Sequence, residues 1–310
     1  MKPFLSLVIP ARNEEENILL LYNEVVKVAD KLKKTWEAIF IDDGSTDNTF
    51  SILKKIHAKD SRVKVLHLRG WFGKATALKA GFEQAVGEII ITLDADLQDN
   101  PKEIPNFLKK FNEGCDLVIG WKKNRHDPSD RVLSSRLFNF AVSVMTHTKF
   151  HDINCGFKAY KREVVENVEF GELFRFIPIL AVKQNYEVAE IAVEHRPRKF
   201  GKSKFGMERA AKGFLDLITI IFLTGYLRKP GQFFGMIGLL MGFLGGLIGM
   251  YITYLRITTG GIEYRYPLLF LGVLLMVVGA QFISTGLLAE MLLSFHTQTS
   301  YNKYVDRKLG

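Results

Sequence analysis

Cysteine is scarce in this chain, and several patterns that would define a class of protein are missing. Cys115 and Cys155 are the only cysteines among 310 residues, so a disulfide framework is excluded and both are expected to be buried thiols. The sequence contains no internal repeat and no low-complexity segment, which excludes a repeat architecture. An apolar strand is expected from Phe4 onward, so no cleavable signal peptide is expected and membrane insertion depends on later segments.

Charged residues are missing from two long stretches, 231–255 and 266–289. About 20 apolar residues cross the hydrocarbon core of a bilayer as a helix, so we predict two transmembrane helices joined by a short loop over 256–265. The net charge is +9, and much of the excess Lys and Arg lies on the two outer flanks of this pair. The positive-inside rule then predicts an integral membrane protein with the N-terminal domain and both termini in the cytoplasm. Anionic lipid accounts for the basic charge, so no nucleic-acid partner is expected.

The first 206 residues alternate apolar strands with amphipathic helices. Strands are expected over 4–9, 38–41, 63–68, 88–93 and 117–120, with helices between the first four. This alternation predicts an α/β fold with a mostly parallel sheet and right-handed crossovers. The predicted organisation is a domain over 1–206, an amphipathic interface helix within 207–230, two transmembrane helices within 231–295 and a cytoplasmic tail over 296–310. A buried soluble helix is the alternative for the interface helix.

Three glycines recur at every fourth position of the first predicted span: Gly238, Gly242 and Gly246. Small residues at this spacing allow helices to approach closely. The pattern therefore predicts that the two spans pack together, and it is also compatible with a homo-oligomer. The general richness of membrane helices in glycine explains it equally well.

Four acids follow directly on two predicted strands: Asp42, Asp43, Asp94 and Asp96. In an open parallel sheet, the carboxyl ends of the strands meet at one edge and hold ligands there. Oxygen ligands from Asp94, Asp96 and Gln98 suit Mg²⁺ or Mn²⁺ bridging a nucleotide diphosphate. The alternative is a solvated acidic turn that caps the helix begun by Pro101.

Four ordered motifs resemble those of family 2 glycosyltransferases. They are Val8-Ile-Pro-Ala-Arg-Asn-Glu14, Ile41-Asp-Asp-Gly-Ser-Thr-Asp47, Gly73-Lys74 with Ala77-Leu78 and Gly81, and Leu93-Asp-Ala-Asp-Leu-Gln98. With the two C-terminal spans, the chain is most similar to the polyisoprenyl-phosphate glycosyltransferase branch, which includes dolichol-phosphate mannose synthases and bactoprenol glucosyltransferases. The resemblance implies a Rossmann-like GT-A domain that uses Mg²⁺ or Mn²⁺.

The resemblance also implies roles for individual residues. The catalytic acids are Asp94 and Asp96, and the metal ligands are Asp94, Asp96 and Gln98. The nucleotide is expected at Pro10, Arg12, Glu14, Asp42, Asp43, Lys74 and Asp94. The acceptor phosphate is expected at Lys122, Arg131, Ser135, Arg136, Arg198 and Lys202. For each single cation, the alternative is a solvated or lipid-facing charge.

Three further segments resemble the branch with differences. The branch's Gly-Ser-Arg motif reads Gly120-Trp121-Lys122 here, which keeps the charge and loses the two-pronged hydrogen bonding of arginine. Residues 152–158 resemble an Asp-x-x-x-Gly-Phe-Arg segment that shapes the sugar and acceptor side of the pocket, with Gly156 allowing close approach of the backbone. Residues 198–204 resemble an Arg-x-x-Gly-x-Ser-Lys loop that suits a lid over a lipid phosphate.

These observations predict an inverting glycosyltransferase that moves a hexose from a nucleotide sugar, with UDP-glucose favoured, to undecaprenyl or dolichyl phosphate at the cytoplasmic face. A phosphate monoester, with a second pKa of about 6, is already a nucleophile at neutral pH and needs no general base. The alternatives are a polyprenyl-phosphate mannose synthase using GDP-mannose, a processive polysaccharide synthase and a catalytically silent membrane scaffold. Processive synthases carry a Gln-x-x-Arg-Trp motif, and no tryptophan of this chain follows an arginine.

Overall fold

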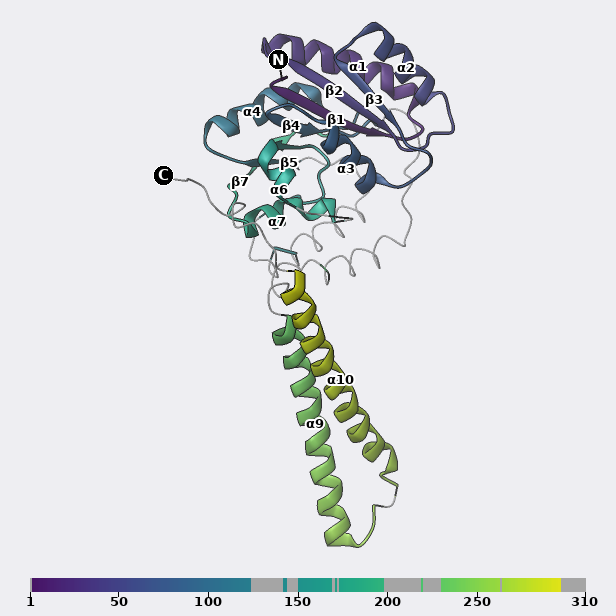
Figure 1. The fold of residues 1–310 in the computed structure, drawn as a ribbon, viewed down its shortest axis with the longest axis vertical. Coiled ribbons are helices and arrows are strands. Elements are labelled where there is room, and N and C mark those ends of the chain that lie inside the picture. Colours follow the sequence, from purple (N-terminus) through teal and green to yellow (C-terminus); the bar gives the residue numbers. More distant parts are fainter. Residues whose placement is uncertain are drawn as a thin grey trace. The chain divides into compact units, whose positions relative to one another are not determined.

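The computed structural model describes residues 2–123, 142–143, 150–168, 171, 173–197, 219, 230–262 and 264–296. The chain divides into two compact units, Met1–Ile220 and Ile221–Gly310, whose elements are labelled in Figure 1. The predicted interface helix lies outside the described residues except for Thr219 and Pro230. The predicted tail beyond His296 also lies outside them.

The first unit is built on a seven-stranded sheet with the order β3-β2-β1-β4-β6-β5-β7. Its strands are β1 (Leu5–Ala11), β2 (Trp36–Asp42), β3 (Val63–His67), β4 (Ile89–Thr92), β5 (Leu117–Lys122), β6 (Lys158–Lys161) and β7 (Val188–Val193). Strand β6 is antiparallel to both neighbours, β4 and β5, and all other pairs are parallel. The prediction of a mostly parallel sheet is confirmed, while β6 and β7 were not expected from the sequence.

Helices connect the strands and cover both faces of the sheet. They are α1 (Glu15–Ala29), α2 (Thr49–Lys59), α3 (Lys74–Gln84), α4 (Ile104–Asn112), α6 (Arg162–Asn167) and α7 (Ile177–Lys183), with short 3₁₀ turns η1 (Asp30–Leu32), η2 (Pro101–Glu103) and η3 (Phe174–Phe176). Helix α1 buries Ile18, Leu21 and Val25, as its apolar spacing predicts. Helices α1 and α2 lie together on one face and α3 lies on the other (Figure 1).

The direction of the chain through the sheet reverses between β1 and β4. The connections from β1 to β2 and from β2 to β3 run one way, and the connection from β3 to β4 returns across them. Ligands of open α/β sheets bind at the carboxyl ends of the strands beside such a reversal. In this chain, that edge carries the turns that follow β1, β2 and β4, where the sequence places its acids.

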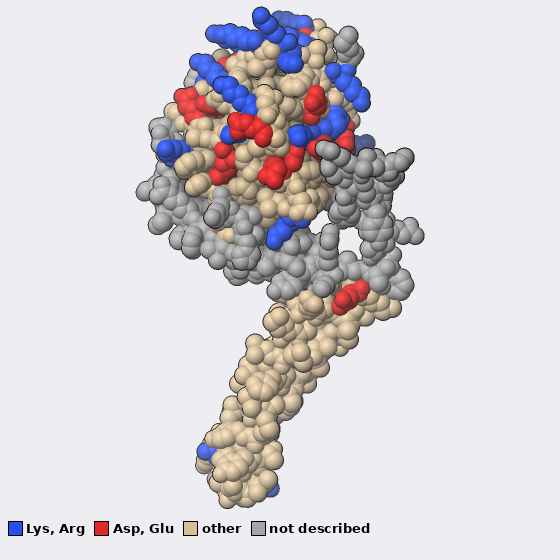
Figure 2. Space-filling view, turned by 90° about the vertical axis from the view of Figure 1, so that its left-hand side faces the viewer, with Lys and Arg blue, Asp and Glu red and all other residues tan. Residues whose placement is uncertain are grey.

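The second unit is a helical hairpin of α9 (Pro230–Thr259) and α10 (Tyr266–His296). Residues 230–259 and 266–292 are each long and apolar enough to cross a membrane. Figure 2 shows this hairpin with hardly any charged side chains along its length. By length and composition the two predicted spans are therefore present, with the first extending through Thr259.

The two helices of the hairpin meet at glycines. A Cβ atom added to Gly238 would lie 2.5 Å from the carbonyl oxygen of Gly279, and one added to Gly245 would lie 2.6 Å from that of Gly272. By contrast, a Cβ added to Gly242 or Gly246 would meet no atom within 4 Å. A Cβ added to Gly279 would nevertheless lie 2.9 Å from the backbone nitrogen of Gly242, so Gly242 also belongs to the contact. The two helices therefore approach each other closely, as the sequence predicts.

Candidate active site

The turns that follow β1 and β2 are bonded to each other. The amide of Asn13 donates to Ser45 Oγ at 2.9 Å, and Asn13 Oδ1 accepts from the amide of Thr46 at 2.8 Å. Asp47 accepts from the amide of Thr49 at 2.9 Å at the start of α2. The bond to Thr49 satisfies one backbone amide at the start of α2, and the other two join the turns, so together they fix the edge of the sheet where a nucleotide is expected.

Asp42 and Asp43 are buried and bonded to the protein itself. Asp42 accepts from the amide of Ser45 at 3.2 Å and pairs with His67 Nδ1 at 2.7 Å. Asp43 accepts from the amides of Phe72 at 2.8 Å and Gly73 at 3.0 Å. Both carboxylates therefore order neighbouring loops, and their contact with a nucleotide stays a prediction.

Arg12 lies against an aromatic side chain from the loop that follows β3. Its guanidinium carbon is 4.2 Å from the centre of the Trp71 ring, within the range of a cation–π contact. Pro10 is paired with Ile41 in the β1–β2 register, and Glu14 accepts from Asn17 Nδ2 at 2.7 Å. The structure thus places Pro10 near the end of β1, and Arg12 and Glu14 on the turn that follows.

Asp94 and Asp96 lie in a tight turn directly after β4. The amide of Asp94 donates to Asp99 Oδ2 at 3.2 Å, and the amide of Gln98 donates to Asp96 Oδ1 at 3.2 Å. Leu97, between Asp96 and Gln98, is buried and has a φ of +62°. Residues other than glycine adopt this backbone conformation only at a cost in free energy. The Asp94 side chain remains 31% exposed, so this acid is accessible at the edge of the sheet.

Lysines from three elements surround this acid turn. Lys74, at the start of α3, forms an ion pair with Asp94, and Lys122, at the end of β5, lies 3.2 Å from Asp99 Oδ1. Burial opposes ionisation of Asp94, but Lys74 and Lys122 outweigh it and hold its pKa below the usual value. Lys158 on β6 is buried, and burial lowers its pKa to about 8.

Gly156 brings the backbone of the 152–158 segment against the acid turn. A Cβ atom at this position would lie 2.7 Å from Asp94 Oδ2. Thr92 Oγ1 donates to the carbonyl oxygen of Gly156 at 2.7 Å and fixes the segment beside β4. The backbone at Gly156 therefore lies against the carboxylate of Asp94, and its close approach to the substrate stays a prediction.

The segment that follows β7 runs alongside the acid turn. Asp99 and His195 form an isolated antiparallel bridge, and the amide of Arg196 donates to the carbonyl oxygen of Gln98 at 3.0 Å. Gln98 Nε2 lies 3.5 Å from the carbonyl oxygen of Arg196, which leaves the amide oxygen as the atom able to bind a metal. An ion pair of 2.8 Å between Arg196 and Glu24 ties the segment to α1.

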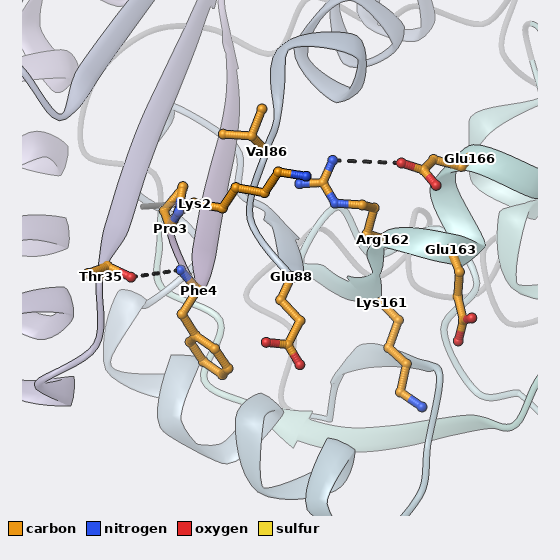
Figure 3. Close-up of a pocket in the computed structure, with 10 residues that line it drawn as sticks. All are labelled: Lys2, Pro3, Phe4, Thr35, Val86, Glu88, Lys161, Arg162, Glu163 and Glu166. Carbon is orange, nitrogen blue, oxygen red and sulfur yellow. Dashed lines mark hydrogen bonds and ion pairs between the residues drawn. The ribbon is translucent and has the colours of Figure 1, made fainter.

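Five residues predicted to hold the acceptor phosphate lie outside the described residues: Arg131, Ser135, Arg136, Arg198 and Lys202. Of that set, the structure describes Lys122 alone. A separate surface cavity of about 610 Å³ lies at the opposite edge of the sheet, where β1, β2 and β4 begin. Figure 3 shows acids and cations mixed in its lining, including the ion pair of Arg162 with Glu166.

The sequence model described as "Glycosyl transferase family 2" matches residues 6–169. The chain belongs to glycosyltransferase family 2. It is 35% identical to a dodecaprenyl-phosphate galacturonate synthase of Rhizobium johnstonii over 98% of this chain and 92% of that protein. It is 38% identical to an undecaprenyl-phosphate 4-deoxy-4-formamido-L-arabinose transferase of Shewanella sediminis over 93% of this chain and 87% of that protein. The resemblance to the polyisoprenyl-phosphate branch is thereby confirmed.

A solved structure shares the GT-A fold at lower identity. The glucosyl-3-phosphoglycerate synthase of Mycobacterium tuberculosis, crystallised with Mn²⁺, uridine diphosphate and phosphoglyceric acid, is 22% identical with a TM-score of 0.56. The match covers 72% of this chain and 79% of that one. It supports the prediction of a GT-A domain for this family 2 member.

The acid turn of this glycosyltransferase has donors that fit a hard divalent cation. Asp94 and Asp96 supply carboxylate oxygens, and Gln98 supplies an amide oxygen, whereas the described residues hold no group of three or more His, Cys, Asp or Glu side chains arranged around a metal. Mg²⁺ is typically bound by one or two carboxylates together with the phosphates of the substrate. The donor set therefore suits a metal that arrives with a nucleoside diphosphate.

Sequence reasoning missed three residues at this edge of the sheet. Asp99 holds the backbone of Asp94, and its place directly after the acid motif is a signal that was present in the sequence. Lys158 stands where the family's segment has arginine. Trp71 lies on Arg12, and no spacing in the sequence indicates that contact.

Proposed function

We propose that this family 2 member transfers a sugar from a nucleoside diphosphate sugar to a polyprenyl phosphate, with inversion at the sugar carbon. The observation that carries the proposal is the accessible carboxylate of Asp94 beside Lys74 at the reversal point of the sheet. Relatives that match almost the whole chain carry names in which the acceptor is dodecaprenyl or undecaprenyl phosphate. Site and relatives together favour this acceptor class over a sugar hydroxyl.

In this proposal, the chain's own residues bind and orient the two substrates. Arg12 and Asp43 lie at the nucleotide side, and Lys74 faces the diphosphate from the start of α3. Lys122 contributes positive charge on the acceptor side, together with the predicted cations outside the described residues. A phosphate acceptor with a second pKa of about 6 attacks the sugar carbon as a dianion, so no side chain has to remove a proton.

The acid turn carries residues that would hold a divalent cation. Asp94 and Asp96 would hold it, with Gln98 as a further ligand. Mg²⁺ or Mn²⁺ at this place supplies neutralisation of the negative charge that develops on the departing diphosphate. Mn²⁺ together with uridine diphosphate occurs in a crystallised enzyme of the same fold, so the fold is able to hold both.

The identity of the sugar is proposed only as a class. The names of the relatives specify galacturonate and 4-deoxy-4-formamido-L-arabinose, and they give no support to the preference for UDP-glucose or to GDP-mannose. We therefore propose that the donor carries a modified sugar. Residues contacting positions 4 and 6 of the ring would set this choice, since these are the positions at which the two sugars carry their modifications.

Membrane insertion completes the proposal. In this proposal, helices α9 and α10 span the bilayer, and the basic flanks favour a cytoplasmic location for the first unit and both termini. The acceptor is then a lipid in the same bilayer. A homo-oligomer remains compatible with the hairpin, on which Gly246 has no atom within 4 Å of an added Cβ.

The test is sugar transfer by the purified full-length chain in lipid nanodiscs. Labelled UDP-galacturonate, UDP-4-deoxy-4-formamido-L-arabinose, UDP-glucose and GDP-mannose are each offered with undecaprenyl phosphate and Mg²⁺ or Mn²⁺, and the label in the lipid fraction is counted. We expect transfer from at least one donor, complete loss with EDTA, and loss of at least 100-fold in Asp96→Ala with unchanged membrane insertion.

Three results would count against the proposal. Absence of label from the lipid fraction with every donor would refute polyprenyl phosphate as the acceptor. Long polysaccharide products would indicate a processive synthase. Undiminished transfer by Asp96→Ala would refute the proposal that Asp96 holds a divalent cation needed for transfer. A scaffold without catalysis predicts neither transfer nor metal-stimulated hydrolysis of any donor.

A further inference from the structure

The loop over residues 70–73 exposes two adjacent aromatic side chains. Trp71 is 69% exposed and Phe72 is 57% exposed. Large apolar side chains that stay exposed together on a folded domain indicate a binding surface more often than single exposed residues do. The loop follows β3 and precedes α3, so it lies at the same edge of the sheet as the acid turn.

This loop is held firmly in place. Asp43, which is buried, accepts hydrogen bonds from the amides of Phe72 and Gly73. Gly44 has a φ of +63°, and a Cβ added to it would lie 2.4 Å from the carbonyl carbon of Gly70. The turn after β2 therefore packs closely against the start of the loop, and the backbone that carries Trp71 is fixed by these contacts.

The guanidinium group of Arg12 lies on one face of the Trp71 indole ring. Its guanidinium carbon lies 4.2 Å from the ring centre, while more than two thirds of the Trp71 residue remains accessible. A cation on one face of an aromatic ring orients that ring and leaves its other face for a second planar group. The residues that hold this arrangement come from the turns of β1 and β2, where the nucleotide is proposed to bind.

We propose that Trp71 stacks on the nucleobase of the donor, with Arg12 on the opposite side of the indole. The inference rests on the proposed function, because it assigns a subsite to the same nucleotide. A nucleobase is favoured over a lipid surface because the guanidinium of Arg12 lies on the Trp71 ring, and Arg12 comes from the turn after β1, where the nucleotide is proposed to bind. Stacking of this kind accepts any base, so the choice of base falls to hydrogen-bonding groups.

The experiment compares ligands with and without a base. Full-length wild type, Trp71→Ala and Phe72→Ala, each in nanodiscs with Mg²⁺, are titrated by calorimetry with UDP, GDP and inorganic pyrophosphate. Loss of one base–aromatic stack weakens binding by roughly 5- to 150-fold, so we expect this loss for both nucleotides in Trp71→Ala and no change for pyrophosphate. Phe72→Ala is the matched control from the same loop and is expected to bind all three ligands like wild type.

Fluorescence provides a second readout. Of the two other tryptophans, Trp36 is buried, with 6% exposure, and the ring of Trp121 stacks on His151 with ring centres 4.3 Å apart. Trp71, the tryptophan proposed to touch the base, is therefore expected to supply most of the change when a nucleotide binds. Trp71→Phe keeps an aromatic ring and should retain affinity within about three-fold, while most of the quenching by UDP disappears. The conservative variant thus separates stacking from a general disturbance of the loop.

The outcomes distinguish this inference from the proposed function. If wild type binds neither UDP nor GDP, the proposed function fails and the inference fails with it. If wild type binds them and Trp71→Ala binds them equally well, the inference alone is refuted. Equal weakening of nucleotides and pyrophosphate in Trp71→Ala also refutes stacking. A blue shift of Trp71 emission on transfer into vesicles, insensitive to UDP, would assign the loop to the membrane surface instead.

Discussion

Replacing Gly156 by alanine should lower the rate of sugar transfer with little loss of stability. The new Cβ atom would lie 2.7 Å from Asp94 Oδ2 and 3.0 Å from Asp94 Cγ. The nearest atoms thus belong to the carboxylate end of a side chain that is 31% exposed. This end can move away without disturbing the core, and Gly156 has no φ in the left-handed region. The fold should therefore accept the methyl group, while the carboxylate shifts.

The size of that shift sets the expected loss of activity. Ordinary van der Waals contact begins near 3.4 Å, so Asp94 Oδ2 must retreat by roughly 0.7 Å. A misplacement of about 1 Å in a catalytic group can cost about 100-fold in rate. We expect kcat/KM for sugar transfer to fall by about 10- to 100-fold, with the melting temperature of the purified protein lowered by no more than about 3 °C.

The assay is transfer of labelled sugar to undecaprenyl phosphate in nanodiscs, measured beside thermal unfolding. Gly246→Ala is the matched glycine-to-alanine control, because a Cβ at that position would meet no atom within 4 Å. A Gly156→Ala enzyme with wild-type kcat/KM would refute the claim that this glycine determines where the carboxylate lies. A large loss of stability would show that the backbone moves to make room for the methyl group and that the Asp94 carboxylate does not.

Two further predictions concern stability. The Arg62 hydrogen bonds, against the opposing effect of burial, lower the pKa of Asp60 from 3.8 to about 2, so the stability they provide is present above pH 3.8 and is lost as the pH falls to 2. Because the Arg62 side chain is 40% exposed and solvent screens the pair, this stability amounts to about 1 kcal/mol. Asp60→Asn should lower the free energy of unfolding by this amount at pH 5 and by much less at pH 2. In the hairpin, Gly238→Leu forces the helices apart and should cost roughly 1–3 kcal/mol. Gly246→Leu should be tolerated, and thermal unfolding in nanodiscs compares the two variants.

Local pattern was sufficient to predict the first half of the domain. Strands β1, β2 and β4 are buried, β3 is partly buried, and turn residues follow each strand. Hydrophobic runs and acids together therefore located all four strands within about three residues. The mostly parallel sheet and the two apolar helices followed from the same signals. The acid turn after β4 lies at the predicted edge because a parallel sheet gathers all such turns on one side.

Non-local contacts account for most of what the sequence did not predict. Strand β6 inserts antiparallel between β4 and β5, and a strand of four residues is too short to carry a clear periodic signal of its own. The bonds from Asp43 to the 70–73 loop join residues about 30 positions apart. Likewise, the hairpin contact at Gly238 and Gly245 depends on which face of α9 meets α10, and spacing within one helix cannot determine that.

The distribution of charge at the sheet edge bears on the choice of acceptor. An acceptor hydroxyl requires a carboxylate or imidazole that is able to take its proton. Here Asp94 is engaged by Lys74, and Asp99 is engaged by Lys122 and by the amide of Asp94. Lysines from α3 and β5 attract anions, and they disfavour proton uptake by the acids they contact. An acceptor that arrives already ionised is attracted by these lysines and needs no acid to take its proton. This is why the geometry favours a phosphate over a hydroxyl group as the acceptor.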